Sequence, residues 1–240
     1  MRTTIHWALC VGALLVSVFP LRASAANTVT IDGLFADWAD EYCQPDTACG
    51  DFTGRDDAKG ACIASDFAAT APSPATTAYL RFDFDATGFF DATIVNGCWL
   101  VDVNQNGRAD RALCFSLQGS PLTLQLTVFF TCNDSSATTC GNATQVATLS
   151  LCAAHAGLTT ERLLICGAGD TGDTGVECSA PLADLGWTSG TITLLRGCTY
   201  SATQPNSTPS DCIVSTSNPF TINPATGGNT PVELLHFGIQ

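Results

Sequence analysis

Apolar and polar residues alternate one by one in several stretches of this chain, and this alternation constrains the fold most strongly. It is clearest in residues 80–85, Leu-Arg-Phe-Asp-Phe-Asp, and in residues 122–130, where an apolar residue occupies every second position. Successive side chains of a β-strand point to opposite faces, so the pattern predicts half-buried strands. No segment carries a 3.6-residue apolar stripe over three turns. The chain is therefore expected to be all-β.

Other segments with strand character are separated by turns rich in Gly, Ser, Thr, Pro, Asn and Asp. These segments are 28–31, 98–102, 112–117, 146–151, 191–196 and 232–239. Many short strands separated by turn signals predict an antiparallel β-sandwich of the immunoglobulin-like or jelly-roll type. Two long connections, 39–77 and 131–145, are expected to be loops tethered to the body by their cysteines.

The N-terminal residues resemble a secretory signal peptide. Arg2 precedes an apolar run over 7–19, which is too short to span a bilayer, and Ala23-Ser24-Ala25 offers the small residues of a cleavage site. Cleavage after Ala25 makes 1–25 the signal peptide and 26–240 a single β-sandwich domain. A membrane anchor is the alternative. The expected location is secreted, extracellular or periplasmic, without membrane insertion of the mature chain.

The charge balance excludes some partners. Of nine Lys and Arg residues, Arg2 and Arg22 leave with the signal peptide, and the rest face 22 Asp and Glu residues. Nucleic acid and anionic lipid both require a basic surface, so neither is an expected partner.

The cysteines predict a disulfide framework. There are thirteen, and removal of Cys10 with the signal peptide leaves an even number in an exported chain, enough for up to six bridges. A zinc site is the alternative, but the chain has no C-x-x-C pair and no Cys/His cluster.

One bridge follows from the expected strand register. If the turn from Asp102 to Asp110 closes a hairpin, Cys98 lies opposite Cys114, at a separation that a disulfide can span. Two further candidate pairs close local loops: Cys132–Cys140 and Cys198–Cys212.

That same turn carries the one motif with evident chemistry. Residues 102–110 follow the pattern D-x-N-x-N-G-x-x-D, which places oxygen side chains at alternate positions and a glycine at the sixth, as calcium loops require. Leu113 replaces the glutamate that closes an EF-hand loop, so we expect a hairpin calcium site with an incomplete ligand shell. A plain polar turn is the alternative, because Asn-Gly alone favours a hairpin. The candidate ligands are Asp102, Asn104, Asn106, the Arg108 carbonyl and Asp110.

No catalytic motif stands out, and a non-enzymatic protein without an organic cofactor is expected. G-x-S-x-G, H-E-x-x-H and phosphate-binding glycine loops are all absent from the sequence. Trp99, on the strand face opposite Cys98, is the candidate ligand platform, because an exposed tryptophan can stack on a sugar ring. A buried core tryptophan is the alternative.

Three separated segments resemble the family 9 carbohydrate-binding-module-like sandwiches of secreted bacterial proteins. Residues 29–38 (VTIDGLFADW) are similar to their IDG…DW opening, 78–85 to one of their strands, and 177–186 to a later segment. The turn 102–110 is similar to an acidic insertion common in such proteins. The resemblance implies a sandwich of two antiparallel sheets with Trp38 sealing the core, and characterised members bind sugars and calcium.

These observations together predict a secreted, non-catalytic binding module with a structural calcium ion. Carbohydrate is the candidate ligand, and polysaccharide or cell-surface components are the candidate partners. The alternative is a structural or adhesive extracellular protein without a small-molecule ligand.

Overall fold

The computed structural model describes residues 29–38, 43–46, 57–67, 75–84, 93–119, 122–148, 151–156, 174–201, 205–213, 220–226 and 228–230. The predicted signal peptide, the predicted strand 232–239 and three cysteines (Cys10, Cys49 and Cys166) lie outside these ranges. Within them, no helix is long and apolar enough to cross a membrane.

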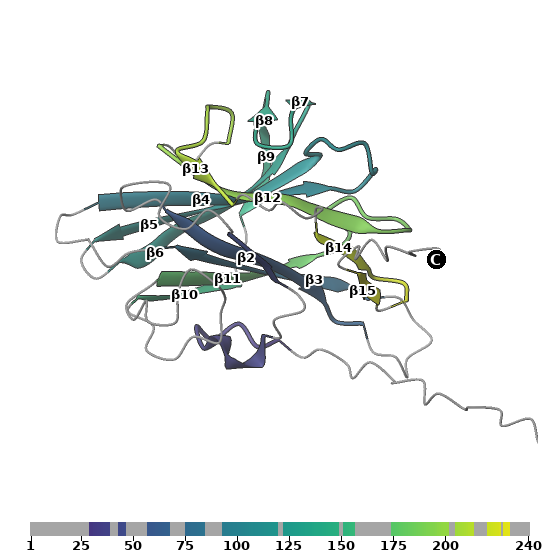
Figure 1. The fold of residues 1–240 in the computed structure, drawn as a ribbon, viewed down its shortest axis with the longest axis horizontal. Helices are drawn as coiled ribbons and strands as arrows, with labels where there is room; N and C mark the ends of the chain where they lie inside the picture. The colour runs from purple at the N-terminus through teal and green to yellow at the C-terminus, as the bar shows by residue number, and fades with distance from the viewer. Residues whose placement is uncertain are drawn as a thin grey trace, which may run out of the picture.

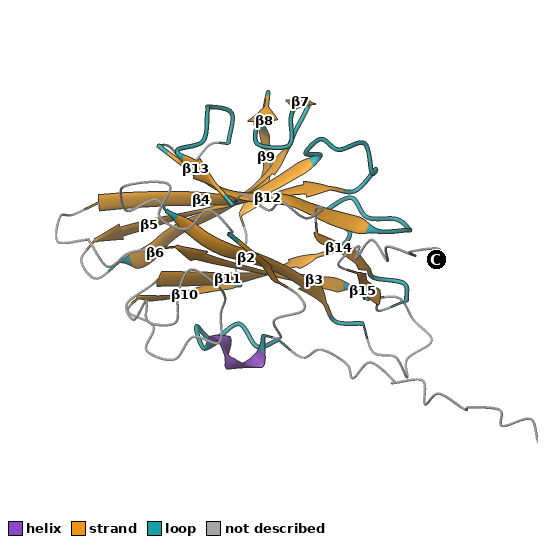
Figure 2. Cartoon of the chain, in the orientation of Figure 1, coloured by secondary structure: helices purple, strands orange, loops and turns teal. Residues whose placement is uncertain are grey.

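Two antiparallel sheets form a sandwich, which confirms the all-β prediction (Figures 1 and 2). The first sheet has the order β1 (Cys43–Pro45), β2 (Ala58–Ser65), β3 (Thr77–Phe84), β11 (Thr174–Pro181) and β10 (Cys152–Ala156). The second has the order β15 (Gly228–Thr230), β14 (Phe220–Asn223), β12 (Ile192–Tyr200), β4 (Thr93–Asp102), β5 (Arg111–Gly119), β6 (Thr123–Thr131) and β9 (Thr144–Thr148). Short strand β13 (Asp211–Cys212) pairs with β12, and β7 (Asp134–Ser135) pairs with β8 (Cys140–Gly141).

Aromatic rings fill the space between the two sheets. Phe82 of β3 packs edge-on against both Trp99 and Phe115 of the second sheet, with ring centroids 6.0 and 5.5 Å away. Phe84 stacks on Phe115. The Trp99 indole donates a hydrogen bond of 2.7 Å to the carbonyl oxygen of Arg81, which ties one sheet to the other. Aromatic pairs of this geometry stabilise a core beyond the area they bury.

The prediction that Trp99 serves as a ligand platform is therefore wrong. Its side chain has no exposed surface, and its one polar atom is already bonded within the core. The alternation in β4 separates the two faces of the strand, but it does not say which face meets the first sheet. Trp38 is also buried, as the family resemblance implied.

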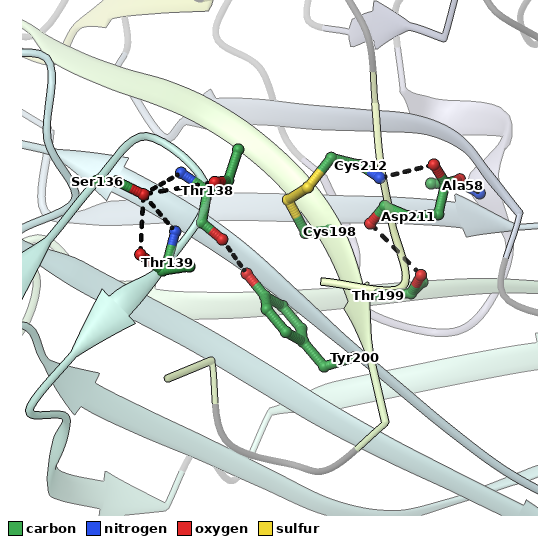
Figure 3. The surroundings of a disulfide bond; sticks show 9 residues. All are labelled: Ala58, Ser136, Thr138, Thr139, Cys198, Thr199, Tyr200, Asp211 and Cys212. Atoms are coloured by element: carbon green, nitrogen blue, oxygen red, sulfur yellow. Dashed lines mark hydrogen bonds between the residues drawn. A yellow bond between two sulfur atoms is a disulfide. The ribbon is translucent and has the colours of Figure 1, made fainter. Parts of the chain in front are cut away.

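A second apolar layer covers the outer face of the second sheet. Cys98, Cys114, Cys198 and Tyr200 are fully or almost fully buried there. Figure 1 places β7, β8 and β13 beyond this face, away from the first sheet. The Tyr200 hydroxyl donates to the carbonyl oxygen of Thr138 at 2.8 Å, so strand β12 holds the β7–β8 segment directly (Figure 3).

Both segments expected to be long loops contain strands. The segment 39–77 includes β1 and β2, and the segment 131–145 includes β7 and β8. Strand β2 lacks polar alternation because nearly all its residues are buried, on both faces of the sheet. The described residues 29–31, expected to form a strand, have no regular structure and lead into a short 3-10 helix, η1 (Phe35–Asp37).

Five disulfides join described residues. They are Cys43–Cys62, Cys98–Cys114, Cys132–Cys140, Cys152–Cys178 and Cys198–Cys212. The three predicted pairs are among them. Every bridge except Cys132–Cys140 joins residues that lie directly opposite each other on neighbouring strands. Such a set of bridges points to an oxidising extracellular or periplasmic environment.

Candidate functional site

The turn 102–110 joins β4 to β5 in the register expected from the sequence. Cys98 lies opposite Cys114, and the Asp110 backbone N–H donates to the carbonyl oxygen of Val101 at 2.9 Å. Gln105 and Gly107 both adopt positive φ, at 62° and 78°. Glycine takes this conformation without steric cost, so Gly107 allows the sharp reversal that the motif predicted.

Asp102 is the centre of the turn. Its side chain is buried, and its carboxylate accepts hydrogen bonds from four backbone N–H groups of the turn. Oδ1 accepts from residues 104, 105 and 106, and Oδ2 accepts from Gly107 at 2.7 Å. These bonds fold the turn around one negatively charged group.

Asp110 closes the turn from its other end. Its Oδ2 accepts from the N–H groups of Val103 and Asn104, and its Oδ1 accepts from the Asn104 side-chain amide at 2.6 Å. The Asn104 N–H lies 3.1 Å from an oxygen of Asp102 and 3.1 Å from an oxygen of Asp110. The two carboxylates therefore converge on one backbone amide rather than pointing apart.

The remaining candidate ligands lie on the same turn. The side-chain oxygen of Asn104 accepts from the N–H of Asn106, and that of Asn106 accepts from the N–H of Arg108. The Arg108 side chain reaches away, toward the carbonyl oxygen of Ser135. Each of these oxygens retains a second lone pair that a cation could use.

The donor set is modest but suited to a hard cation. The described residues contain no group of three or more His, Cys, Asp or Glu side chains placed to hold a metal. The turn offers two carboxylates supplemented by neutral amide oxygens, which is the oxygen-only chemistry that calcium accepts. Within the described part of the chain, neither carboxylate pairs with a basic side chain.

Two residues that were not predicted for the site contact the turn, Thr191 and Thr193. The Gln105 amide donates to the carbonyl oxygen of Thr191 and to the hydroxyl of Thr193, at 3.1 and 3.0 Å. Half-buried Trp187 lies on the segment that leads to Thr191, with its indole donating to the carbonyl oxygen of Gly190. The sequence of the turn does not predict the two threonines, because they lie 86 and 88 residues after Gln105 in the chain.

A buried charge cluster lies elsewhere, on the outer face of the first sheet. Arg81 and Asp83 form an ion pair of 2.8 Å, and Glu177 lies opposite Arg81 on β11. Phe35 lies over the Arg81 guanidinium, whose carbon is 4.3 Å from the ring centre. Figure 1 shows η1 covering this face, on the side away from the second sheet.

Glu177 anchors the covering segment. One of its oxygens accepts from the N–H groups of Asp32 and Gly33, at 2.7 and 2.5 Å, and the other accepts from the Trp38 indole at 3.0 Å. Burial raises the pKa of Glu177, and these three donors oppose that shift. Every oxygen is used to hold the fold, so we assign this cluster a structural role.

Comparison with known proteins adds no relative: no protein-family model, no curated protein and no solved structure matches the chain.

Proposed function

We propose that this protein is an exported, non-catalytic β-sandwich module whose turn 102–110 binds calcium as a structural ion. The observation that carries the proposal is the convergence of Asp102 and Asp110 on the Asn104 amide, with no cationic partner among the described residues. Two negative charges within one tight turn repel each other, and a divalent cation removes that cost. The five bridges support the exported location.

Calcium should raise the melting temperature of the purified protein. A site filled at one hundred times its dissociation constant stabilises the folded state by about 2.7 kcal/mol. For a domain of this size that corresponds to a rise of roughly 5–10 °C over the EDTA-treated protein. Magnesium, which accepts fewer ligand geometries, should give a smaller rise.

A pair of variants tests whether the rise comes from this turn. Asp110→Asn removes one of the two carboxylates and should abolish the calcium-dependent part of the shift. Asp184→Asn, at an exposed position of the turn 182–186, changes the net charge equally and should leave the shift intact. Equal melting temperatures with calcium and with EDTA for the unmodified protein would refute the proposal.

Carbohydrate binding is the second candidate function. The observation that favours it is the partial exposure of Trp187, which is half-buried, unlike the fully enclosed Trp99. A sugar ring stacked on the indole would be oriented by neighbouring hydroxyl and amide groups. This candidate keeps the predicted function of a sugar-binding module, but it assigns the stacking role to Trp187 instead of Trp99.

A glycan array probed in calcium and in EDTA tests this candidate, with Trp187→Ala as the matched variant. Binding that disappears in the variant supports a sugar site at Trp187. An array without signal leaves the structural or adhesive role, in which calcium and disulfides confer durability alone.

A further inference from the structure

Four cysteines form an unbroken row across the outer face of the second sheet. In register, Cys212 of β13 faces Cys198 of β12, Cys198 faces Cys98 of β4, and Cys98 faces Cys114 of β5. Residues directly opposite in an antiparallel sheet point to the same face. The two bridges Cys198–Cys212 and Cys98–Cys114 therefore lie end to end, and all four residues belong to one apolar cluster.

The inner two cysteines also lie at a separation that a disulfide can span. The bridged pairs have Cα separations of 4.0 and 4.1 Å, which is typical of opposite residues that exchange no backbone hydrogen bonds. A residue whose N–H and C=O point away from one neighbouring strand points them at the other. Cys98 and Cys198 are therefore a hydrogen-bonded pair, about 5.5 Å apart, near the preferred Cα separation of a disulfide.

The four cysteines differ in exposure, and this difference determines which sulfur an external thiol can reach first. Cys98 and Cys198 are completely buried and Cys114 is 1 % exposed, whereas Cys212 is partly exposed. Figure 3 shows Cys212 bridged to Cys198. A thiol from solvent can therefore reach the outer sulfur of the Cys198–Cys212 bridge first. Which sulfur is attacked decides which one leaves, so attack at Cys212 releases Cys198, directly beside Cys98.

We propose that Cys212 is a site of S-thiolation by small-molecule thiols, and that the exchange is relayed inward to the Cys98–Cys114 bridge. In the first step the external thiolate bonds to the Cys212 sulfur, the Cys198–Cys212 bond breaks, and Cys198 leaves as a thiolate. In the second step Cys198 bonds to the Cys98 sulfur, the Cys98–Cys114 bond breaks, and Cys114 leaves and takes up a proton. Two disulfides exist before and after, so no separate oxidant or reductant is needed.

The relay changes what the bridges hold. Before exchange, Cys198–Cys212 ties the segment 205–213 to strand β12. Afterwards β12 is tied to β4 instead, and that segment is held by non-covalent contacts alone, such as the packing of Ile213 in the core and the hydrogen bonds from Ser210 to Thr199 and from Ile213 to Gly197. The sandwich keeps its covalent cross-links while part of its outer layer is released.

The variant Cys212→Ser tests the relay without an external thiol, because it leaves Cys198 unpaired beside Cys98. Trypsin cleaves after Arg108, Arg111 and Arg196, so acid-quenched alkylation, digestion and mass spectrometry distinguish the two pairings. The proposal predicts that peptide 82–108 becomes linked to 197–240 and that Cys114 becomes alkylated. Retention of the original pairing, with alkylation at Cys198 alone, would overturn it.

The control is Cys198→Ser, which leaves Cys212 unpaired but one strand further from Cys98. Here the Cys98–Cys114 bridge should stay intact and only Cys212 should be alkylated. Should either variant fail to fold, the unmodified protein answers the question after a short exposure to glutathione. The expected first product carries glutathione on Cys212 and an alkyl group on Cys114. Glutathione on any other cysteine, or an alkyl group on Cys198 alone, would refute the relay.

Discussion

Replacing Glu177 by Gln should loosen the N-terminal segment 29–38 from the first sheet. The amide oxygen can still accept from the Asp32 and Gly33 N–H groups, but the amide NH₂ then faces the Trp38 indole N–H, where a carboxylate oxygen accepted at 3.0 Å. Two buried donors meet with no acceptor between them. Both Glu177 and Trp38 have almost no exposed surface, so water does not relieve the mismatch.

The magnitude follows from these contacts. Loss of one hydrogen bond to a charged acceptor, together with a buried donor left unsatisfied, costs about 3 kcal/mol. In a Trp38→Phe background the facing donor is already gone, so the same Glu177→Gln change should cost only about 1 kcal/mol. The double-mutant cycle should therefore give a coupling free energy of about 2 kcal/mol.

Urea unfolding of the four proteins, with disulfides intact and followed by far-ultraviolet circular dichroism, measures each free energy of unfolding. Trp99 and Trp187 remain in all four proteins, so fluorescence gives a second probe. If Glu177→Gln costs the same in both backgrounds, the Trp38–Glu177 bond does not hold the segment and the reasoning fails.

Three further outcomes follow from the same structure. Burial raises the pKa of Glu177 above its ordinary value of 4.5. The contribution of Glu177 to stability should therefore be greatest below pH 4.5 and should fall as the pH rises through the raised pKa. Glu177→Gln should flatten this part of the plot of urea midpoint against pH. Gly97→Ala drives the new Cβ into the Phe115 ring and should cost about 1–3 kcal/mol in urea unfolding, partly recovered by adding Phe115→Leu. Tyr200→Phe removes the donor to the Thr138 carbonyl and should cost about 1 kcal/mol; an unchanged midpoint would mean that this bond does not hold the outer layer.

The parts of the fold that the sequence predicted are those with local causes. The bridge Cys98–Cys114 could be predicted because a short turn fixes the register on both sides of it. The bridge Cys152–Cys178 could not be predicted, because β10 and β11 are separated by a longer connection whose length does not set a register. Strand β2 escaped detection for a related reason: a strand buried on both faces shows no alternation.

The same contrast between local and long-range causes applies to the candidate site. The spacing of Asp102, Gly107 and Asp110 is a property of one turn, and the turn adopts the predicted shape. The position of Trp99 depends on which face of β4 meets the other sheet, and both faces turned out to be buried. Thr193 meets Gln105 only because β12 pairs with β4, so no local pattern could have placed it there.

The anchor of segment 29–38 also constrains the order of folding. Asp32 emerges early in synthesis, but its acceptor Glu177 lies 145 residues further along the chain. The segment therefore cannot settle until β11 has joined the first sheet, and until then Arg81 lacks the ring of Phe35 above it. Contacts of such long sequence separation slow folding, because the loop must close before the contact stabilises anything. The segment 29–38 is therefore expected to be among the last described parts of the fold to become ordered.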